Sequence, residues 1–497
     1  MQPGPVSRRS FLVGATIAAA GVALETAVGK TQELAFLTLK QASEALRRKT
    51  ASPVDLTVAC LKRIETYNPV LNAFITVMHD QAMETARAME AEQRRGKWRG
   101  PLHGVPIALK DNIDTAGIRT TVASELFKDR VPSEDVIVAR RLKDAGAIIL
   151  GKTNLHEMAY GGTSAVSYFG PVHNPWALDR IPGGSSGGSA AATAAGLCFG
   201  ALGTDTAASV RGPASFCGIV GFKPTYGRVS TRGVVPLSWT MDHVGPLSRT
   251  VEDAGLMLSA IAGYDELDPA SADRPVPDYS GALRMQTSRF RLGIPKSPFF
   301  DNLDPEIARA VDAAIAVVGK LTASSREIEL PSPNLPMDQI YASVRSVEAY
   351  TYHAKWLAES PEKYQPSTRQ RLVQNFAEIK TETYAQSLRQ VQLLRKEIWK
   401  TFETVDILIT PTLPLLPVKI ANGTEPVGGS RYPLGIRNTA PFNVLGVPAI
   451  TVPCGFTTSG LPIGLQIVAA PFAETTVLAL AGAYENQTEW HLRRPPL

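Results

Sequence analysis

Hydrophobic residues recur along this chain with two different spacings, which together predict a sheet covered by helices. Apolar positions at helical spacing predict one helix over residues 32–48 and a second from Ser52 to about Tyr67. Ser52 has the features of an N-cap, because a proline occupies the next position and an acid lies in the first turn. Short apolar runs at 105–109 and 147–150 instead resemble buried strands that deliver a polar residue at their ends. This alternation indicates an α/β fold.

The remainder of the chain continues the alternation around a segment with few large side chains. Residues 133–145 have a helical period, and residues 304–400 turn helical again after an Asp-Pro-Glu start. Between them, residues 155–235 are rich in Gly, Ser, Ala and Thr. Later strands are predicted at three places: near 407–410, 449–452 and 463–468. With no repeat and no polar linker, we predict a single domain over residues 30–497.

The first 29 residues have a different character and predict an export signal. Arg8 and Arg9 precede an apolar run, Phe11 to Leu24, that is too short to span a bilayer. Residues 7–12 (SRRSFL) resemble the twin-arginine signal, which a receptor recognises. An N-terminal membrane anchor is the alternative. We therefore expect an exported protein, periplasmic or extracellular, that engages the twin-arginine export machinery and keeps no stable membrane span in its mature form.

Composition and charge narrow the classes of partner. A chain of 497 residues with 44% hydrophobic and 20% charged residues is too apolar for general disorder. Its 51 Lys and Arg against 46 Asp and Glu give a net charge of +5, too weak to indicate a nucleic-acid partner. The cysteines lie far apart without a C-x-x-C motif, so we expect small buried apolar residues rather than disulfides. They are Cys60, Cys198, Cys217 and Cys454.

A glycine and serine tract, residues 183–189 (GGSSGGS), precedes an Ala-rich helix at 190–195. Backbone amides at such a helix start suit an anion. However, no Gly-Lys-Ser/Thr follows for a phosphate loop, and no hydrophobic strand precedes for dinucleotide binding. The missing strand also argues against a nucleophile elbow centred on Ser185 or Ser186. His156 has no second histidine at a metal-binding spacing, so neither metal nor cofactor is expected.

A second segment of small residues, 203–211 (GTDTAASVR), follows an apolar run. It predicts a strand that turns into a helix start near Ser209, a position that suits a nucleophile. Four successive backbone N–H groups there could converge on the oxygen of an attacked carbonyl. They belong to Thr206, Ala207, Ala208 and Ser209.

Several motifs, in this order and spacing, resemble the amidase signature family. They are Lys110, residues 183–189, 203–211 and 216–225 (FCGIVGFKPT), and residues 441–443 and 446–453. The similarity extends from about residue 33 to the C-terminus. It implies an α/β fold with a large mixed central β-sheet covered by helices on both faces, and it implies a Ser-Ser-Lys triad.

The resemblance implies Ser209 as the nucleophile, Ser185 as a bridging serine after a cis peptide bond, and Lys110 as the base. A lysine acts as a base only when its amine is neutral, which burial promotes. The hydroxyl of Ser185 can accept one proton and donate another, so it can relay between the other two. The alternatives are a surface lysine at a strand end and two serines that cap helices.

Other residues are expected to support this site. Arg211 is expected to hold its loop by pairing with Asp205 rather than by binding substrate, and Ser186 is a further supporting residue. A further segment consists of Gly161, Gly162 and Thr163. It resembles the family segment that lines the acyl pocket, and a tight turn is the alternative interpretation.

One position departs from the family, which usually has Gly-Gly immediately before the nucleophile. This chain has Ala207 and Ala208 there. If either position required a positive φ, alanine would cost about 1 kcal/mol. We expect the two methyl groups to narrow the site toward particular acyl groups.

These observations predict an amidase that hydrolyses carboxylic amides, with esters or carbamates as further substrates, through an acyl-enzyme. One alternative is a subunit of an amidotransferase that acts on misacylated tRNA. The expected export and the modest net charge argue against this alternative. Another is a non-catalytic binding protein on the same fold. We expect the chain to bind a small-molecule amide substrate and not to bind nucleic acid. The sequence is compatible with a homodimer.

Overall fold

The computed structural model describes residues 33–330, 336–421 and 435–497. In these ranges eleven strands form one mixed sheet in the order β1-β3-β2-β4-β6-β5-β10-β11-β9-β7-β8. The strands are β1 (Phe74–Val77), β2 (Pro106–Lys110), β3 (Ile148–Thr153), β4 (Gly200–Asp205), β5 (Val220–Lys223), β6 (His243–Ser248), β7 (Arg291–Pro295), β8 (Ser324–Ile328), β9 (Ile407–Pro411), β10 (Ala449–Phe456) and β11 (Pro462–Ala469). The prediction of a large mixed sheet is confirmed.

Strand direction places two chemically important strand ends side by side. β2 is parallel to both of its neighbours, β3 and β4, whereas β6, β5, β10 and β11 continue the sheet in antiparallel pairs. Adjacent parallel strands end at the same edge of a sheet. Lys110 at the end of β2 and Asp205 at the end of β4 therefore lie at one edge.

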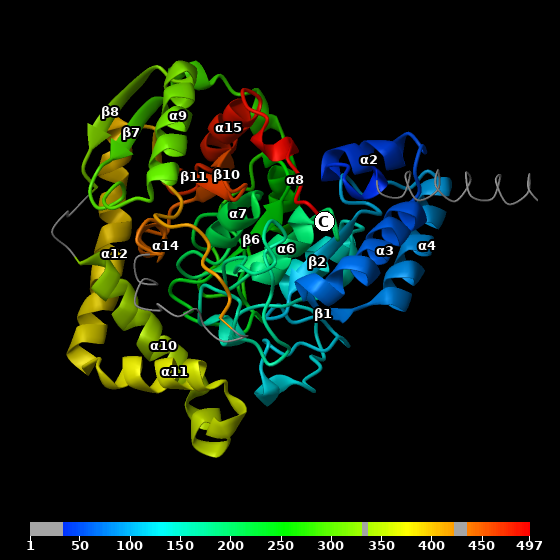
Figure 1. The fold of residues 1–497 in the computed structure, drawn as a ribbon, viewed down its shortest axis with the longest axis horizontal. Helices are drawn as coiled ribbons and strands as arrows, with labels where there is room; N and C mark the ends of the chain where they lie inside the picture. Colours follow the sequence, from blue (N-terminus) through cyan, green and yellow to red (C-terminus); the bar gives the residue numbers. More distant parts are fainter. Residues whose placement is uncertain (1–32, 331–335, 422–434) are drawn as a thin grey trace, which may run out of the picture.

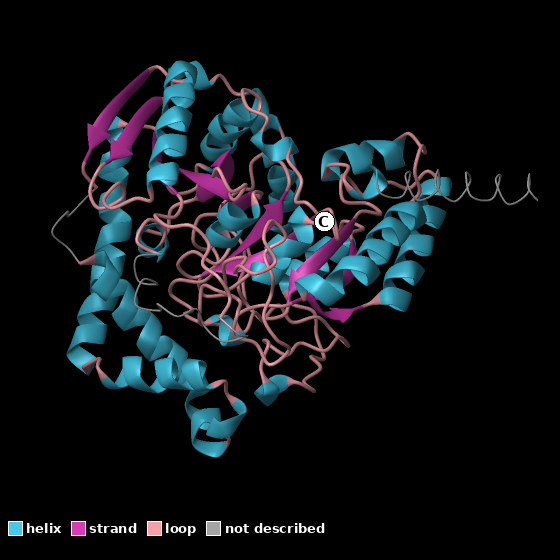
Figure 2. Ribbon diagram, viewed as in Figure 1, coloured by secondary structure: helices cyan, strands magenta, loops and turns pink. Residues whose placement is uncertain are grey.

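Helices surround the sheet on both faces (Figures 1 and 2). They are α2 (Leu39–Arg47), α3 (Pro53–Leu71), α4 (His79–Arg94), α5 (Ile137–Asp144), α6 (Gly187–Ala194), α7 (Arg211–Cys217), α8 (Val251–Ile261), α9 (Pro305–Leu321), α10 (Met337–Glu359), α11 (Pro366–Ala377), α12 (Thr381–Thr404), α14 (Ala440–Val444) and α15 (Glu474–Glu485). α6 and α7 pack against the central strands, and α8, α9 and α15 form a second group. Figure 1 shows α10, α11 and α12 as an arm on the side opposite to α2, α3 and α4.

Helix starts follow the capping residues of the sequence. Ser52 caps α3 as predicted: its Oγ accepts from the backbone N of Asp55 at 3.1 Å, and the Asp55 carboxylate accepts from the backbone N of Ser52 at 2.9 Å. α2 starts later than predicted, at Leu39, because Thr38 provides its cap. α5 likewise begins at Ile137 rather than at residue 133.

The stretch predicted as helical over residues 304–400 contains a strand. β8 lies at the edge of the sheet and pairs in parallel with β7. Its side chains, Ser324 to Ile328, are mostly polar and exposed. An edge strand without a buried face has no apolar pattern by which it could be recognised.

Apolar side chains of the described residues form a large interior that includes the cysteines. All four cysteines are buried and free, which confirms the prediction made for them. Burial raises the pKa of each thiol, and that of Cys198 reaches about 11. Within the described ranges, no helix is long and apolar enough to span a membrane.

Candidate active site

Lys110 is fully buried at the end of β2, which excludes the alternative of a surface lysine. Its Nζ lies 2.7 Å from the Oγ of Ser185 and 2.7 Å from the Oγ1 of Thr204. Burial lowers the pKa of Lys110 to about 7, although the charges of Asp242 and Asp205 act to raise it. The amine is therefore able to exist in its neutral form near neutral pH.

The glycine tract lets the chain carry Ser185 to this lysine. The peptide bond between Gly184 and Ser185 is cis, as the resemblance implies, and Gly183 has a φ of 82°. A Cβ on Gly184 would lie 2.8 Å from backbone atoms of residues 162–164, so the close approach requires glycine. α6 begins only after Ser186, which makes no side-chain cap bond. Ser185 is thus not a helix cap.

Ser186 joins this turn to the strand and loop beside it. Its Oγ donates to the carbonyl O of Thr204 at 3.1 Å and accepts from the backbone N of Thr204 at 3.3 Å. Its backbone N donates to the carbonyl O of Ser209 at 3.2 Å. Ser186 therefore holds the segments that carry Ser185, Thr204 and Ser209 against one another.

Ser209 lies in the loop between β4 and α7 and lines a cavity of about 1110 Å³ together with Thr206 and Ala207. Val210, not Ser209, occupies the N-cap position of α7. Among the described residues, the backbone N–H groups of residues 206–209 have no hydrogen-bond partner. Unpaired backbone donors beside a serine in a cavity are able to bind the negative charge that develops on a carbonyl oxygen.

Arg211 pairs with Asp205 in the interior, where both side chains are 0% exposed. Its Nε and Nη2 donate to the carboxylate at 3.0 and 2.9 Å, and Nη2 also donates to the carbonyl O of Ala207 at 3.0 Å. Burial raises the pKa of Asp205, but the Arg211 charge and hydrogen bonds outweigh it and hold that pKa below its usual range. The pair anchors the loop that leads to Ser209.

The two alanines before the nucleophile fit the loop without backbone strain. Neither Ala207 nor Ala208 has a positive φ. The energetic cost considered for alanine at a positive φ therefore does not arise. Ala207 lines the cavity, so a narrowing effect of its methyl group stays a prediction.

Residues 161–163 lie between the cavity and the glycine tract. Gly161 lines the cavity, and a Cβ there would lie 2.2 Å from the ring of His156. Thr163 Oγ1 is 3.1 Å from Nδ1 of the same ring. A Cβ on Gly184 would approach the backbone of Gly162 at 2.8 Å. Glycine is therefore needed at position 161 for a reason of packing.

His156 contacts polar side chains that are not metal ligands. Burial lowers its pKa well below the usual value, so the ring is neutral, and its partners are Thr163 and Arg371. Within residues 33–330, 336–421 and 435–497, no group of three or more His, Cys, Asp and Glu side chains is placed to hold a metal ion.

Three polar residues of the site were not identified in the sequence. Thr204 accepts from Lys110 and also from the Nδ2 of Asn112, at 3.2 Å. Asp242 accepts from the Oγ1 of Thr206 at 2.6 Å. Asn112 lies only two positions after Lys110, but β2 ends at Lys110 and a turn follows, so no strand pattern could have placed its side chain beside the lysine. The others depend on contacts between distant segments.

The helical arm contributes two cations to the cavity, Arg345 and Arg371. Arg371 Nη1 donates to the carbonyl O of Tyr160 at 3.0 Å, and the guanidinium of Arg345 lies 5.0 Å from the centroid of the Tyr160 ring. Asn375 donates to the Tyr160 hydroxyl at 3.0 Å. Asp338 of α10 also lines the cavity, so the arm contributes two cations and one acid to it, a small excess of positive charge.

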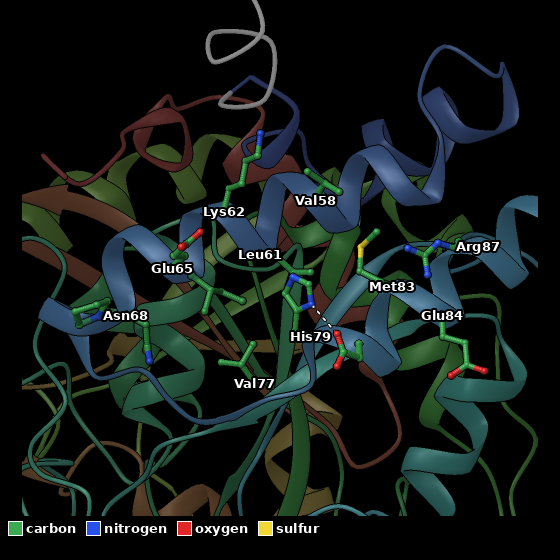
Figure 3. A pocket seen from close by; sticks show the side chains of 13 residues that line it. Val58, Leu61, Lys62, Glu65, Asn68, Val77, His79, Met83, Glu84 and Arg87 are labelled. Atoms are coloured by element: carbon green, nitrogen blue, oxygen red, sulfur yellow. Dashed lines mark hydrogen bonds and ion pairs between the residues drawn. The ribbon is translucent and has the colours of Figure 1, made fainter. Parts of the chain in front are cut away.

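A second hollow, of about 1010 Å³, lies between α3, β1 and α4 (Figure 3). The apolar side chains that point into it include Val58, Leu61 and Met83. Charged side chains such as Lys62 and Arg87 surround them. None of the triad residues lines it. It is separate from the candidate active site.

With the geometry in place, comparison with known proteins decides the family. The sequence profile of the Amidase family matches residues 55–478. The chain belongs to the Amidase family. It is 42% identical over 488 residues to the A subunit of the glutamyl-tRNA(Gln) amidotransferase of Moorella thermoacetica, and the alignment covers 94% of this chain and 99% of that protein.

Solved structures of this family have the same fold. The native peptide amidase of Stenotrophomonas maltophilia is 30% identical with a TM-score of 0.81, and the comparison covers 93% of this chain and 98% of that one. A 6-aminohexanoate cyclic dimer hydrolase in complex with substrate is 29% identical with a TM-score of 0.83, covering 93% and 99%. Over nearly its whole length, this Amidase-family chain therefore resembles both hydrolases and part of an amidotransferase.

The comparison corrects the predicted location. The prediction of an exported protein, periplasmic or extracellular, is wrong: relatives 39–42% identical over 92–94% of this chain are A subunits of glutamyl-tRNA(Gln) amidotransferases. A glutamyl-tRNA belongs to protein synthesis, which takes place inside the cell. The twin-arginine export machinery consequently has no support as a partner. Residues 1–29, on which the prediction depended, lie outside the described residues.

Proposed function

We propose that this Amidase-family chain cleaves carboxylic amide C–N bonds by acyl transfer, with Ser209 as nucleophile, Ser185 as proton relay and Lys110 as base. The observation that carries the proposal is the buried 2.7 Å contact between Lys110 Nζ and Ser185 Oγ. It stands beside a cavity that Ser209 lines. A base held neutral by burial is what a serine nucleophile needs.

In the first half of the reaction, Ser209 Oγ attacks the amide carbonyl. Its proton passes to Ser185, and the Ser185 proton passes to the neutral amine of Lys110. The N–H groups of residues 206–209 receive the negative charge that develops on the carbonyl oxygen. Collapse of the tetrahedral intermediate breaks the C–N bond, while Ser185 returns a proton to the leaving nitrogen and is reprotonated by Lys110.

In the second half, a water molecule attacks the carbonyl carbon of the acyl-enzyme. Ser185 and Lys110 act again, now with water in place of the Ser209 hydroxyl and Ser209 in place of the leaving nitrogen. The relay takes a proton from water, the carboxylic acid leaves, and Ser209 regains its hydrogen. The pKa of Lys110, about 7, suits both directions, because the amine accepts and returns a proton at little cost near neutral pH.

Of the two finer functions, that of the A subunit of a glutamyl-tRNA amidotransferase has more support than hydrolysis of free linear amides. Relatives with this name are 39–42% identical over 92–94% of this chain. Glutamine, as the amide donor, would present a carboxylate that suits Arg345 and Arg371 in the cavity. The released ammonia would then serve an assembly that includes other proteins and a charged tRNA.

Hydrolysis of small-molecule amides is the second candidate, and one observation favours it. The cavity also has apolar walls, to which Leu237, Phe299 and Ile436 contribute. Such walls suit an acyl group that is larger and less polar than that of glutamine.

Release of ammonia or amine by the purified chain tests the proposal. The panel contains glutamine, an aliphatic amide, an anilide and a peptide amide, with Ser209→Ala as the control. Turnover that Ser209→Ala abolishes supports acyl transfer, and full turnover in that variant overturns it. Glutamine as the preferred substrate supports the amidotransferase role, whereas preference for the anilide or peptide amide supports the hydrolase.

A further inference from the structure

We propose that Thr204 and Asn112 are positioning residues that orient the amine of Lys110 so that its lone pair faces Ser185. This inference rests on the proposed function, because it assigns a task only if Lys110 acts as the base. Neither residue belongs to the Ser-Ser-Lys triad.

The number of donors and acceptors around Thr204 supports this assignment. A neutral amine has two N–H bonds and one lone pair, and a hydroxyl oxygen has two lone pairs. Asn112 Nδ2 donates to Thr204 Oγ1 at 3.2 Å, and Lys110 Nζ donates to the same oxygen at 2.7 Å. An amine that gives one N–H to Thr204 cannot turn its lone pair toward that oxygen, so the lone pair is available to accept the proton of Ser185.

Thr204 is itself held firmly in place from two sides. Ser186 Oγ bonds to both the carbonyl O and the backbone N of Thr204, at 3.1 and 3.3 Å. Asn112 is fixed in turn, since its Nδ2 also donates to the carbonyl O of Val235 at 3.3 Å. Thr204 and Asn112 are buried at 3% and 1% exposure, so water does not compete for these bonds.

Charged groups around Lys110 act differently from Thr204. Asp205 on the same strand as Thr204 and Asp242 before β6 raise the pKa of Lys110 through their charge. His156 on the other side is neutral because burial lowers its pKa. Thr204 carries no charge, and its oxygen stabilises the ammonium more than the neutral amine because it accepts from an N–H. Its removal should therefore lower the pKa of Lys110.

The test is the pH profile of kcat/KM for the best substrate of the amide panel, measured for Thr204→Val and Thr204→Ser. We expect Thr204→Val to lower kcat/KM by about 10- to 100-fold, mostly through kcat, because a bond to a chargeable group is lost. We also expect the acidic pKa of the profile to fall by about one unit. Thr204→Ser should restore both values. Thr193→Val, a buried threonine of α6 outside the site, is the matched control.

Loss of rate without a shift of the acidic pKa would show a merely structural role and overturn the inference. An upward shift would also overturn it, because Thr204 would then be donating to the amine. If Thr204→Val does not fold, Asn112→Ala replaces it, with the same expected direction for rate and pKa. Ser209→Ala is assayed alongside, and full activity of that variant overturns the proposed function. If Ser209→Ala is inactive but the pH profile and kcat/KM of Thr204→Val are unchanged, this inference alone is overturned.

Discussion

Removal of the Arg211 guanidinium should destabilise the protein strongly, because it leaves a buried carboxylate without its counterion. Asp205 and Arg211 are both 0% exposed, and all the guanidinium nitrogens donate hydrogen bonds. Nη1 donates to Gln466 at 2.7 Å and Nη2 to Asn443 at 2.5 Å. Breaking a buried pair on one side costs about 3–5 kcal/mol. We expect the free energy of unfolding of Arg211→Met to be lower than that of the wild type by about 3–5 kcal/mol.

The double variant Arg211→Met/Asp205→Asn separates the charge from the packing. It removes the uncompensated carboxylate, so we expect it to be more stable than Arg211→Met. Arg291→Met is the matched control, because Arg291 pairs with Asp406 at 2.8 Å while both side chains are partly exposed, at 42% and 32%. A partly exposed pair of this kind contributes at most about 1 kcal/mol.

Urea-induced unfolding followed by tryptophan fluorescence measures these differences as shifts of the midpoint. The activity of Arg211→Met should also fall, by up to about 100-fold, because Nη2 no longer holds the carbonyl O of Ala207 near the nucleophile. Either a loss below about 1 kcal/mol in Arg211→Met or a double variant no more stable than the single one would show that Arg211 does not compensate a buried charge on Asp205.

Three further predictions concern other parts of the chain. Gly161→Ala should lower kcat, because its methyl group would meet the His156 ring at 2.2 Å, and unchanged kinetics would contradict this packing. Ala207→Gly should broaden the range of acyl groups accepted in the amide panel, since Ala207 lines the cavity, and an identical preference profile would disprove the narrowing effect. Burial raises the pKa of Glu485 from 4.5 to about 8, so this group binds its proton more tightly in the folded state, and wild-type stability should fall as pH rises between those values. Glu485→Gln should show a shallower fall in urea midpoints at pH 5, 6.5 and 8, and an unchanged slope would argue against a protonated Glu485.

Features that depend on local sequence could be predicted, and the strand that delivers Lys110 is the best example. An apolar run ending in lysine predicts a buried strand, and β2 has that form. The cap at Ser52 was equally local, because its partner Asp55 is three residues away. The segments that carry Ser185 and Ser209 depended instead on similarity to a family.

Features that depend on sheet pairing could not be predicted. Thr204 meets Lys110 only because β4 pairs in parallel with β2, and Asp242 meets Thr206 only because β6 pairs with β4. Arg371 reaches the cavity from α11, whose helical period says nothing about where that helix packs. The register between distant strands and the position of the arm depend on tertiary contacts. Helix and strand propensities and hydrophobic periodicity describe only local sequence, so they do not predict these contacts.

The most direct test of the central claim is the site and pH dependence of labelling by a fluorophosphonate probe. We expect one modified peptide, containing Ser209, and a labelling rate that falls as pH drops through about 7 and Lys110 takes up a proton. Ser209→Ala should not be labelled, and Lys110→Ala should be labelled far more slowly. Modification of a different residue, or equal labelling of Ser209→Ala, would exclude Ser209 as the nucleophile.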